Sequence, residues 1–129
     1  MNPQAVRFET GMRLKEKGFD VPTDYGYDSK GGYYQDETFK VNYNGDPYTD
    51  LVCSAPTIAE VVMWLYEKHG IWVSVDIGMT GFYGHYKVNP QNTSPSNLKQ
   101  GWANDQDNPA KSITEAYESA IIYSLEKLI

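Results

Sequence analysis

Cysteine, histidine and long apolar runs are scarce in this sequence, and each shortage excludes a class of protein. The one cysteine, Cys53, cannot form an internal disulfide and is typical of a reducing compartment. No apolar run approaches the ~20 residues of a membrane-spanning helix, and the first residues alternate charged with apolar groups, unlike a signal peptide. We therefore expect a soluble, cytoplasmic protein that does not bind a membrane.

Basic residues are also few. Lysine and arginine total 11 against 17 acidic residues, which leaves a net charge of -6 and no field that attracts phosphate backbones. We do not expect nucleic-acid binding. Two histidines and one cysteine without ligand spacing do not make a zinc signature, and no glycine-rich loop precedes a helix. The sequence therefore predicts neither a metal nor a cofactor.

The remaining composition is that of a folded protein. Hydrophobic residues make up 40% of the 129 positions and aromatic residues 14%, enough to build a core. The length is close to the commonest domain size and too short for two independent cores of ordinary size. We expect a single domain over residues 1–129.

Three segments carry helix signals. Residues 3–17 begin with a proline suited to a first turn and are followed by Gly18, which can end a helix with Phe19 folding back on it. The second helix begins with the capping-box pair Thr57 and Glu60 and ends at Gly70. The third helix begins with a second capping-box pair, Ser112 and Glu115, and continues to the end of the chain. The apolar stripe of the second helix consists of Ile58, Val61, Val62 and Leu65, and that of the third of Ile113, Ala116, Tyr117, Ala120, Ile121, Leu125 and Leu128.

Strand signals follow the second helix directly. Residues 71–77 alternate β-branched with other side chains, glycines in 78–81 supply a turn, and 82–88 return as an antiparallel partner. One face then carries Tyr83, His85 and Lys87, while Gly84 weakens the strand or marks a bulge. A short strand over 38–43 and an earlier hairpin turning at Gly31 and Gly32 are also predicted.

Residues 89–111 have three prolines and no period, which predicts a long loop of functional or mobile character. With the third helix expected to pack on the hairpin, the fold class is α+β, a two-layer sandwich with a small antiparallel sheet packed against helices.

A family resemblance rests on three sequence blocks and on the aromatic-rich middle of the chain. The blocks are "LKEKGFD", "APTIAEVVMWLYEKHGIWVSV" and "SITEAYESAIIYSLEKLI". The sequence resembles small proteins of gut Bacteroidetes and their phages. The resemblance covers about half of the chain and implies a setting on a mobile element. That group has no established activity, so the resemblance implies no catalytic or binding residue.

Few residues are candidates for chemistry, and we assign no catalytic residue. His69 lies in the last turn of a helix, where a cation is favoured by the helix dipole, so we expect a capping or surface role. His85 can face Ser74 or Asp76 across the hairpin, most simply as a solvated cross-strand pair. Cys53 is expected in the core.

Tyrosine is over-represented, with 11 residues, and its large ring with a polar tip suits both half-buried packing and partner surfaces. The binding candidates are Tyr83, His85, Trp72, Asp76, Trp102, Tyr33 and Tyr34. Our first hypothesis is a non-enzymatic protein-interaction module with a protein partner or a homodimer. The alternative is a protein that binds an aromatic or nucleobase-like small molecule. An enzyme that uses His85 with Asp76 and a tyrosine comes third.

Overall fold

The structure is a computed structural model that describes residues 5–35, 38–46, 49–91, 93–104 and 108–129. In this part of the chain it contains three α-helices and two antiparallel three-stranded sheets, with helix–sheet contacts, which confirms the α+β fold class. The chain divides into two compact units, Met1–Val61 and Val62–Ile129, and the boundary lies within a helix. That the two units form a single domain stays a prediction.

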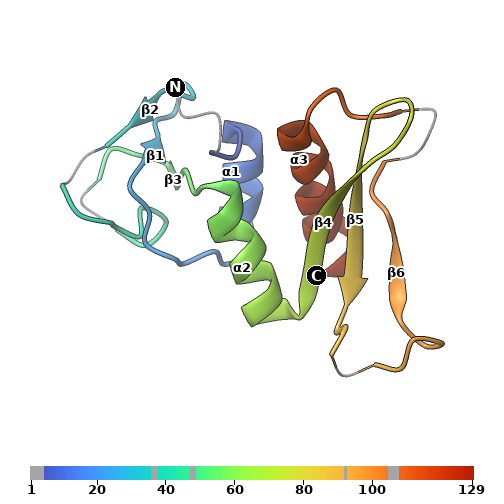
Figure 1. Cartoon of the computed structure of the whole chain (residues 1–129). Coiled ribbons are helices and arrows are strands. Elements are labelled where there is room, and N and C mark those ends of the chain that lie inside the picture. The colour runs from blue at the N-terminus through green and yellow to red at the C-terminus, as the bar shows by residue number, and fades with distance from the viewer. Residues whose placement is uncertain (1–4, 36–37, 47–48, 92, 105–107) are drawn as a thin grey trace. The chain divides into compact units, whose positions relative to one another are not determined.

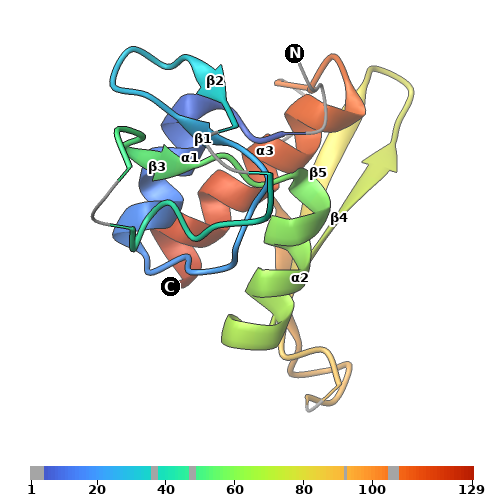
Figure 2. The ribbon, with the colours of Figure 1, turned by 90° about the vertical axis from the view of Figure 1, so that its left-hand side faces the viewer.

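The first unit contains helix α1 (Phe8–Glu16) and the strands β1 (Gly26–Tyr27), β2 (Tyr33–Tyr34) and β3 (Cys53–Ser54), in the sheet order β2-β1-β3. Figure 2 shows these short strands beside α1, and α1 contacts β3. Helix α1 ends as expected: Gly18 has φ 86°, and the Phe19 N–H donates to the Leu14 carbonyl at 3.0 Å. The hairpin that turns at Gly31, with φ 81°, is also confirmed.

Two predictions for the first unit were wrong in extent. Residues 5–7 are not helical, because the Val6 N–H donates to the Pro56 carbonyl and Ala5 bridges Thr57; Pro3 lies outside the described residues. Residues 38–43 do not form a strand, since only Val41 makes a bridge, to Thr23. The following turn at 42–45 ends the extended stretch there.

Helix α2 (Ile58–His69) crosses the boundary between the units. Its capping box is confirmed, because the Glu60 N–H donates to Thr57 Oγ1 at 3.1 Å and the Thr57 N–H donates to Glu60 Oε1 at 2.9 Å. Val61 and Leu65 of its apolar stripe are fully buried. Gly70, with φ 68°, lies between the last residue of α2 and the first residue of the next strand.

The second unit contains the strands β4 (Ile71–Ile77), β5 (Phe82–Val88) and β6 (Lys99–Trp102) in the order β4-β5-β6. Helix α3 (Ile113–Tyr123) packs on β4 and β5, as Figure 1 shows, and continues into a π-helical turn, η1 (Ser124–Leu128). The predicted hairpin and the packing of the last helix on it are confirmed. The buried side chains of this layer include Val73, Tyr86, Ala116, Ala120, Ile121 and Leu125.

Three details of the second unit differ from expectation. Residues 89–111 are not one loop, because β6 lies within them and pairs with β5, and Ala110 bridges Phe82. Gly84 marks no bulge, since the β4–β5 register is unbroken. It allows close packing instead: a Cβ there would lie 2.5 Å from the Ala116 carbonyl oxygen. Ile113 is half exposed, outside the stripe that the sequence assigned to it.

Candidate functional site

One face of the β4–β5–β6 sheet carries five of the seven binding candidates. The register places Ser74, His85 and Trp102 in one row across the sheet, and Asp76 opposite Tyr83 in the next. Trp72 begins a third row, opposite Lys87. Because side chains alternate along a strand, all of them lie on the face away from the buried Val73 and Tyr86. We call this surface the outer face.

Trp102 reaches the outer face because β6 extends the sheet. Its ring makes edge contacts with His85, at a centroid distance of 4.7 Å, and with Tyr83, at 6.3 Å. The Trp102 side chain is nevertheless 52% exposed, and Trp72 is 39% exposed. The outer face therefore presents two half-exposed indole rings, one on β4 and one on β6, with His85 on the middle strand β5.

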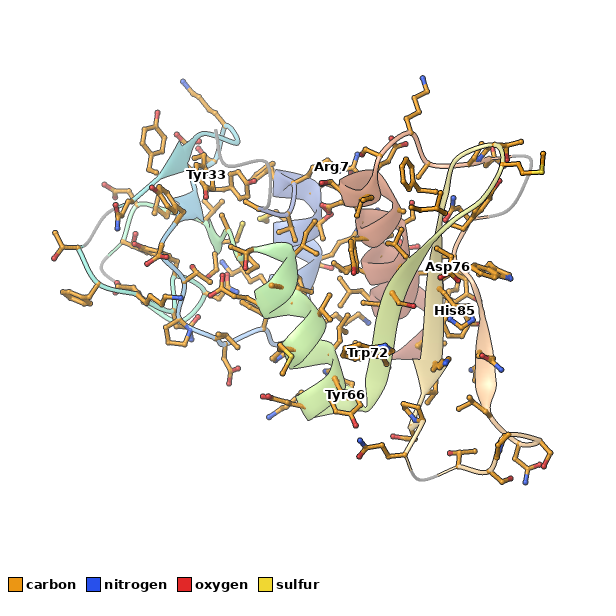
Figure 3. The ribbon with its side chains drawn as sticks, viewed as in Figure 1. Arg7, Tyr33, Tyr66, Trp72, Asp76 and His85 are labelled. Carbon is orange, nitrogen blue, oxygen red and sulfur yellow. The ribbon has the colours of Figure 1, made fainter. Side chains whose placement is uncertain are left out.

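The surroundings of His85 disfavour its charged form. Partial burial lowers its pKa first, and the nearby Lys87 lowers it further, while Asp76 raises it by a smaller amount. In the described part of the chain no hydrogen bond joins His85 to Asp76 or to Ser74. Figure 3 shows Asp76 and His85 on the neighbouring strands. His85 lies directly opposite Ser74 and diagonally from Asp76, with its ring against Trp102.

A shallow, open hollow adjoins this face where α2 turns into β4. It has a volume of about 400 Å³ and is lined by Tyr66, Trp72, Lys87, Pro90 and Gln91. The Tyr66 and Trp72 rings meet nearly at right angles, 83°, with centroids 5.6 Å apart (Figure 3). A smaller hollow of about 220 Å³ continues past Gly70. A planar group can stack on the Tyr66 ring or on the Trp72 ring here, and the Lys87 ammonium group lines the same hollow.

Tyr33 and Tyr34 form β2 in the first unit and do not belong to the outer face. Tyr33 stacks on Tyr25, with centroids 4.4 Å apart and an interplanar angle of 10°. Tyr34 is 55% exposed, whereas Tyr27 is buried and packs with Cys53. Within the described residues, the tyrosines of this region are therefore divided between buried and exposed positions.

The remaining chemical candidates have structural positions. Cys53 is fully buried, as expected, and burial raises the pKa of its thiol to about 11. His69 packs edge-on against Trp64 at 4.8 Å, and burial followed by the Lys68 charge lowers its pKa. The lowered pKa disfavours the cationic form that a helix C-terminus would stabilise. His69 does lie in the last turn of α2 with a half-buried side chain, and its capping or surface role stays a prediction.

Sequence reasoning missed Tyr66, Pro90 and Gln91 as surface neighbours of Trp72. Tyr66 had a signal in the sequence, which is Gly70 between the second helix and the following strand. A helix that passes into a strand within two residues brings its last turn beside the first residues of the strand. The position of residues 90 and 91 had no local signal, because it depends on where β5 ends.

The described residues contain no cluster of three or more histidine, cysteine or acidic side chains able to hold a metal ion. No helix in the described part of the chain is long and apolar enough to cross a membrane. Comparisons with protein-family models, with curated proteins and with solved structures each find no match. The outer face must therefore be interpreted from its own chemistry.

Proposed function

We propose that this chain is a non-enzymatic interaction module that binds another protein through the outer face. The observation that carries the proposal is the pair of half-exposed tryptophans, Trp72 and Trp102, on one face of a regular sheet. Tryptophan and tyrosine are enriched at the centres of protein interfaces, where they exclude water around a few strong contacts.

The shape of the surface supports a protein partner. The hollows where α2 meets β4 are shallow and open. A sheet face of this kind provides a broad contact area for another protein, whereas small molecules usually bind in enclosed pockets. The charges of Asp76 and Lys87 flank the aromatic rings and would give a docked surface its register. His85 serves in this proposal as a neutral packing group beside Trp102.

The test compares affinity capture by the wild-type chain with capture by a Trp72→Ser, Trp102→Ser double variant. A matched control is Met63→Ser, which also removes a half-exposed apolar side chain, but from α2. We expect a protein that is retained by the wild type and by the control and lost by the double variant, and that binds the purified chain in calorimetry. If the double variant retains the same proteins, the outer face is not the binding surface.

A second candidate function rests on the hollow lined by Tyr66, Trp72 and Lys87. We propose, as the alternative, that it binds a planar aromatic or nucleobase-like molecule stacked on these rings. Titration of a ring-compound library with tryptophan fluorescence tests it. A saturable signal that persists in Trp102→Phe and disappears in Trp72→Phe supports the alternative, and a signal unchanged in Trp72→Phe contradicts it.

The setting of the protein also stays a proposal. We infer from the three resembling sequence blocks that the gene belongs to a gut bacterial mobile element or phage and that the protein acts in the cytoplasm. Inspection of the neighbouring genes tests the first inference, since chromosomal housekeeping neighbours in every genome would contradict it. Fractionation of cells that express a tagged chain tests the second.

A further inference from the structure

The two hollows beside the end of α2 lie in series along the start of the β4–β5 hairpin. The larger is lined by the cross-strand pair Trp72 and Lys87. The smaller is lined by the preceding hydrogen-bonded pair, Gly70 and Asn89. Two residues of an antiparallel strand span about 7 Å, so the hollows follow one another at about that step. The residues that line both hollows are Tyr66, Pro90 and Gln91. We call the two hollows together the corner groove.

The corner groove combines aromatic walls with hydrogen-bond donors. The Tyr66 and Trp72 rings stand nearly perpendicular, at 83°, with their centroids 5.6 Å apart (Figure 3). Within the described residues, the Trp72 indole N–H and the Gln91 amide donate no hydrogen bond to another group of the protein. A ligand that presents both apolar rings and carbonyl oxygens would complement these walls and these donors.

A proline-rich segment in the polyproline II conformation has this chemistry. It has apolar rings, no internal hydrogen bonds, and backbone carbonyls that are open to donors. Segments of this kind bind in aromatic-lined grooves, and their conformation is largely formed before binding. One polyproline II turn rises about 9 Å, which is comparable with the step between the two hollows, so successive turns can place a proline in each.

A partner strand, by contrast, would need backbone groups that β4 does not expose. Ile71 and Val73 are each 1% exposed, so the start of this strand is covered. A polyproline II segment needs no backbone ladder, because it is held by side chains. We propose that the corner groove binds a proline-rich segment of the protein partner. The inference rests on the proposed function, since the groove adjoins the outer face and shares Trp72 with it.

Two charges give the bound segment a direction. Lys87 lines only the larger hollow, and Glu67 lines only the smaller. Neither side chain forms an ion pair with any other part of the described chain. A segment with an acidic residue at one end of its prolines and a basic residue at the other complements both charges. A single planar ring would occupy one hollow and would make no use of Glu67.

Titration of the full chain with two synthetic peptides tests the proposal. Each peptide is a run of prolines between an arginine and a glutamate, and the two peptides differ in which end carries the arginine. We expect saturable NMR shifts of the Trp72 indole and Gln91 amide signals, with one peptide bound about fivefold more tightly than the other. A control peptide with glycine and serine in place of proline should not bind, because it is flexible.

Two variants locate the binding site. Trp72→Ala should weaken binding of the preferred peptide by at least about tenfold, since it removes one aromatic wall. The matched control is Phe39→Ala, which removes a ring that is 63% exposed and lines neither hollow, and which should leave the affinity unchanged. The charge-exchanged double variant Glu67→Lys, Lys87→Glu should keep its fold and invert the preference between the two peptides.

Each contrary outcome is distinct. Absence of peptide binding, equal affinity for the two peptides, full affinity in Trp72→Ala, or a preference that the charge exchange leaves unchanged would overturn the proposal. If a captured protein is lost by the Trp72→Ser, Trp102→Ser variant and the peptides do not compete for it, the outer face is confirmed and the proline-rich segment is refuted. If the peptides bind as described and that variant still captures the same proteins, only the outer-face proposal fails.

Discussion

Replacing Gly84 with alanine tests how closely α3 approaches the sheet. Gly84 lies in the middle strand, and glycine in a strand interior ordinarily weakens the strand. By that argument alone, alanine would stabilise the protein by about 0.5–1 kcal/mol through a smaller entropy of the unfolded chain. The structure predicts the opposite effect, which is that Gly84→Ala lowers the free energy of unfolding.

A Cβ at position 84 would lie 2.5 Å from the Ala116 carbonyl oxygen and 3.0 Å from the Ala120 Cβ. Both neighbours belong to α3, and neither can rotate away, because one is backbone and the other is a methyl group. The helix must move off β5, which loosens the buried Ile121 and Leu125 with it. Such overpacking costs about 1–3 kcal/mol, so we expect a net destabilisation of about 2 kcal/mol.

Urea unfolding followed by circular dichroism measures the effect, and the thermal midpoint should fall by roughly 6–10 °C for a chain of this size. Gly45→Ala is the control, because its Cβ would lie closest to Asn42 Nδ2, at 3.0 Å, which is the end of a side chain that can rotate, while the nearest backbone atom is 4.0 Å away. We expect the control to change the free energy of unfolding by less than about 0.5 kcal/mol. A Gly84→Ala variant as stable as the wild type would refute the close approach of α3 to β5.

Further outcomes follow from three local environments. The Cys53 thiol, with its pKa raised to about 11, should resist alkylation at pH 8 in the folded protein and react at once in urea; fast native labelling would contradict its burial. The lowered pKa of His85 means that the unfolded chain binds more protons below its ordinary value of 6.5, so stability should be complete above that pH and fall as the solution is acidified. NMR titration should place the His85 pKa below 6.5 and show it higher in Lys87→Gln; a value at or above 6.5 in the wild type would contradict the electrostatics. Thr57→Ala should cost about 1 kcal/mol in urea unfolding by removing one half of the capping box, and an unchanged midpoint would mean that the cap contributes nothing.

Much of the fold was predictable because its signals are local. The cap at Thr57, the stops at Gly18 and Gly70 and the alternation in 71–77 each depend on residues within one turn or one strand. The outer face was partly predictable for the same reason, since alternation alone assigns Trp72, Asp76, Tyr83 and His85 to one side. These features need no knowledge of the rest of the chain.

Other features were decided only by tertiary structure. The strand at 99–102 has a weak local pattern, and it forms because β5 offers it a ladder; this pairing is what brings Trp102 against His85. The lowered pKa of His69 depends first on its partial burial, which its position in the last turn of a helix does not indicate. Sequence determined where helices end and which side chains share a strand face, because those choices are made by neighbouring backbone groups. Tertiary structure determined which distant segments supply the remaining hydrogen bonds and exclude water. These contacts bring the aromatic rings of the outer face together and lower the pKa of His85.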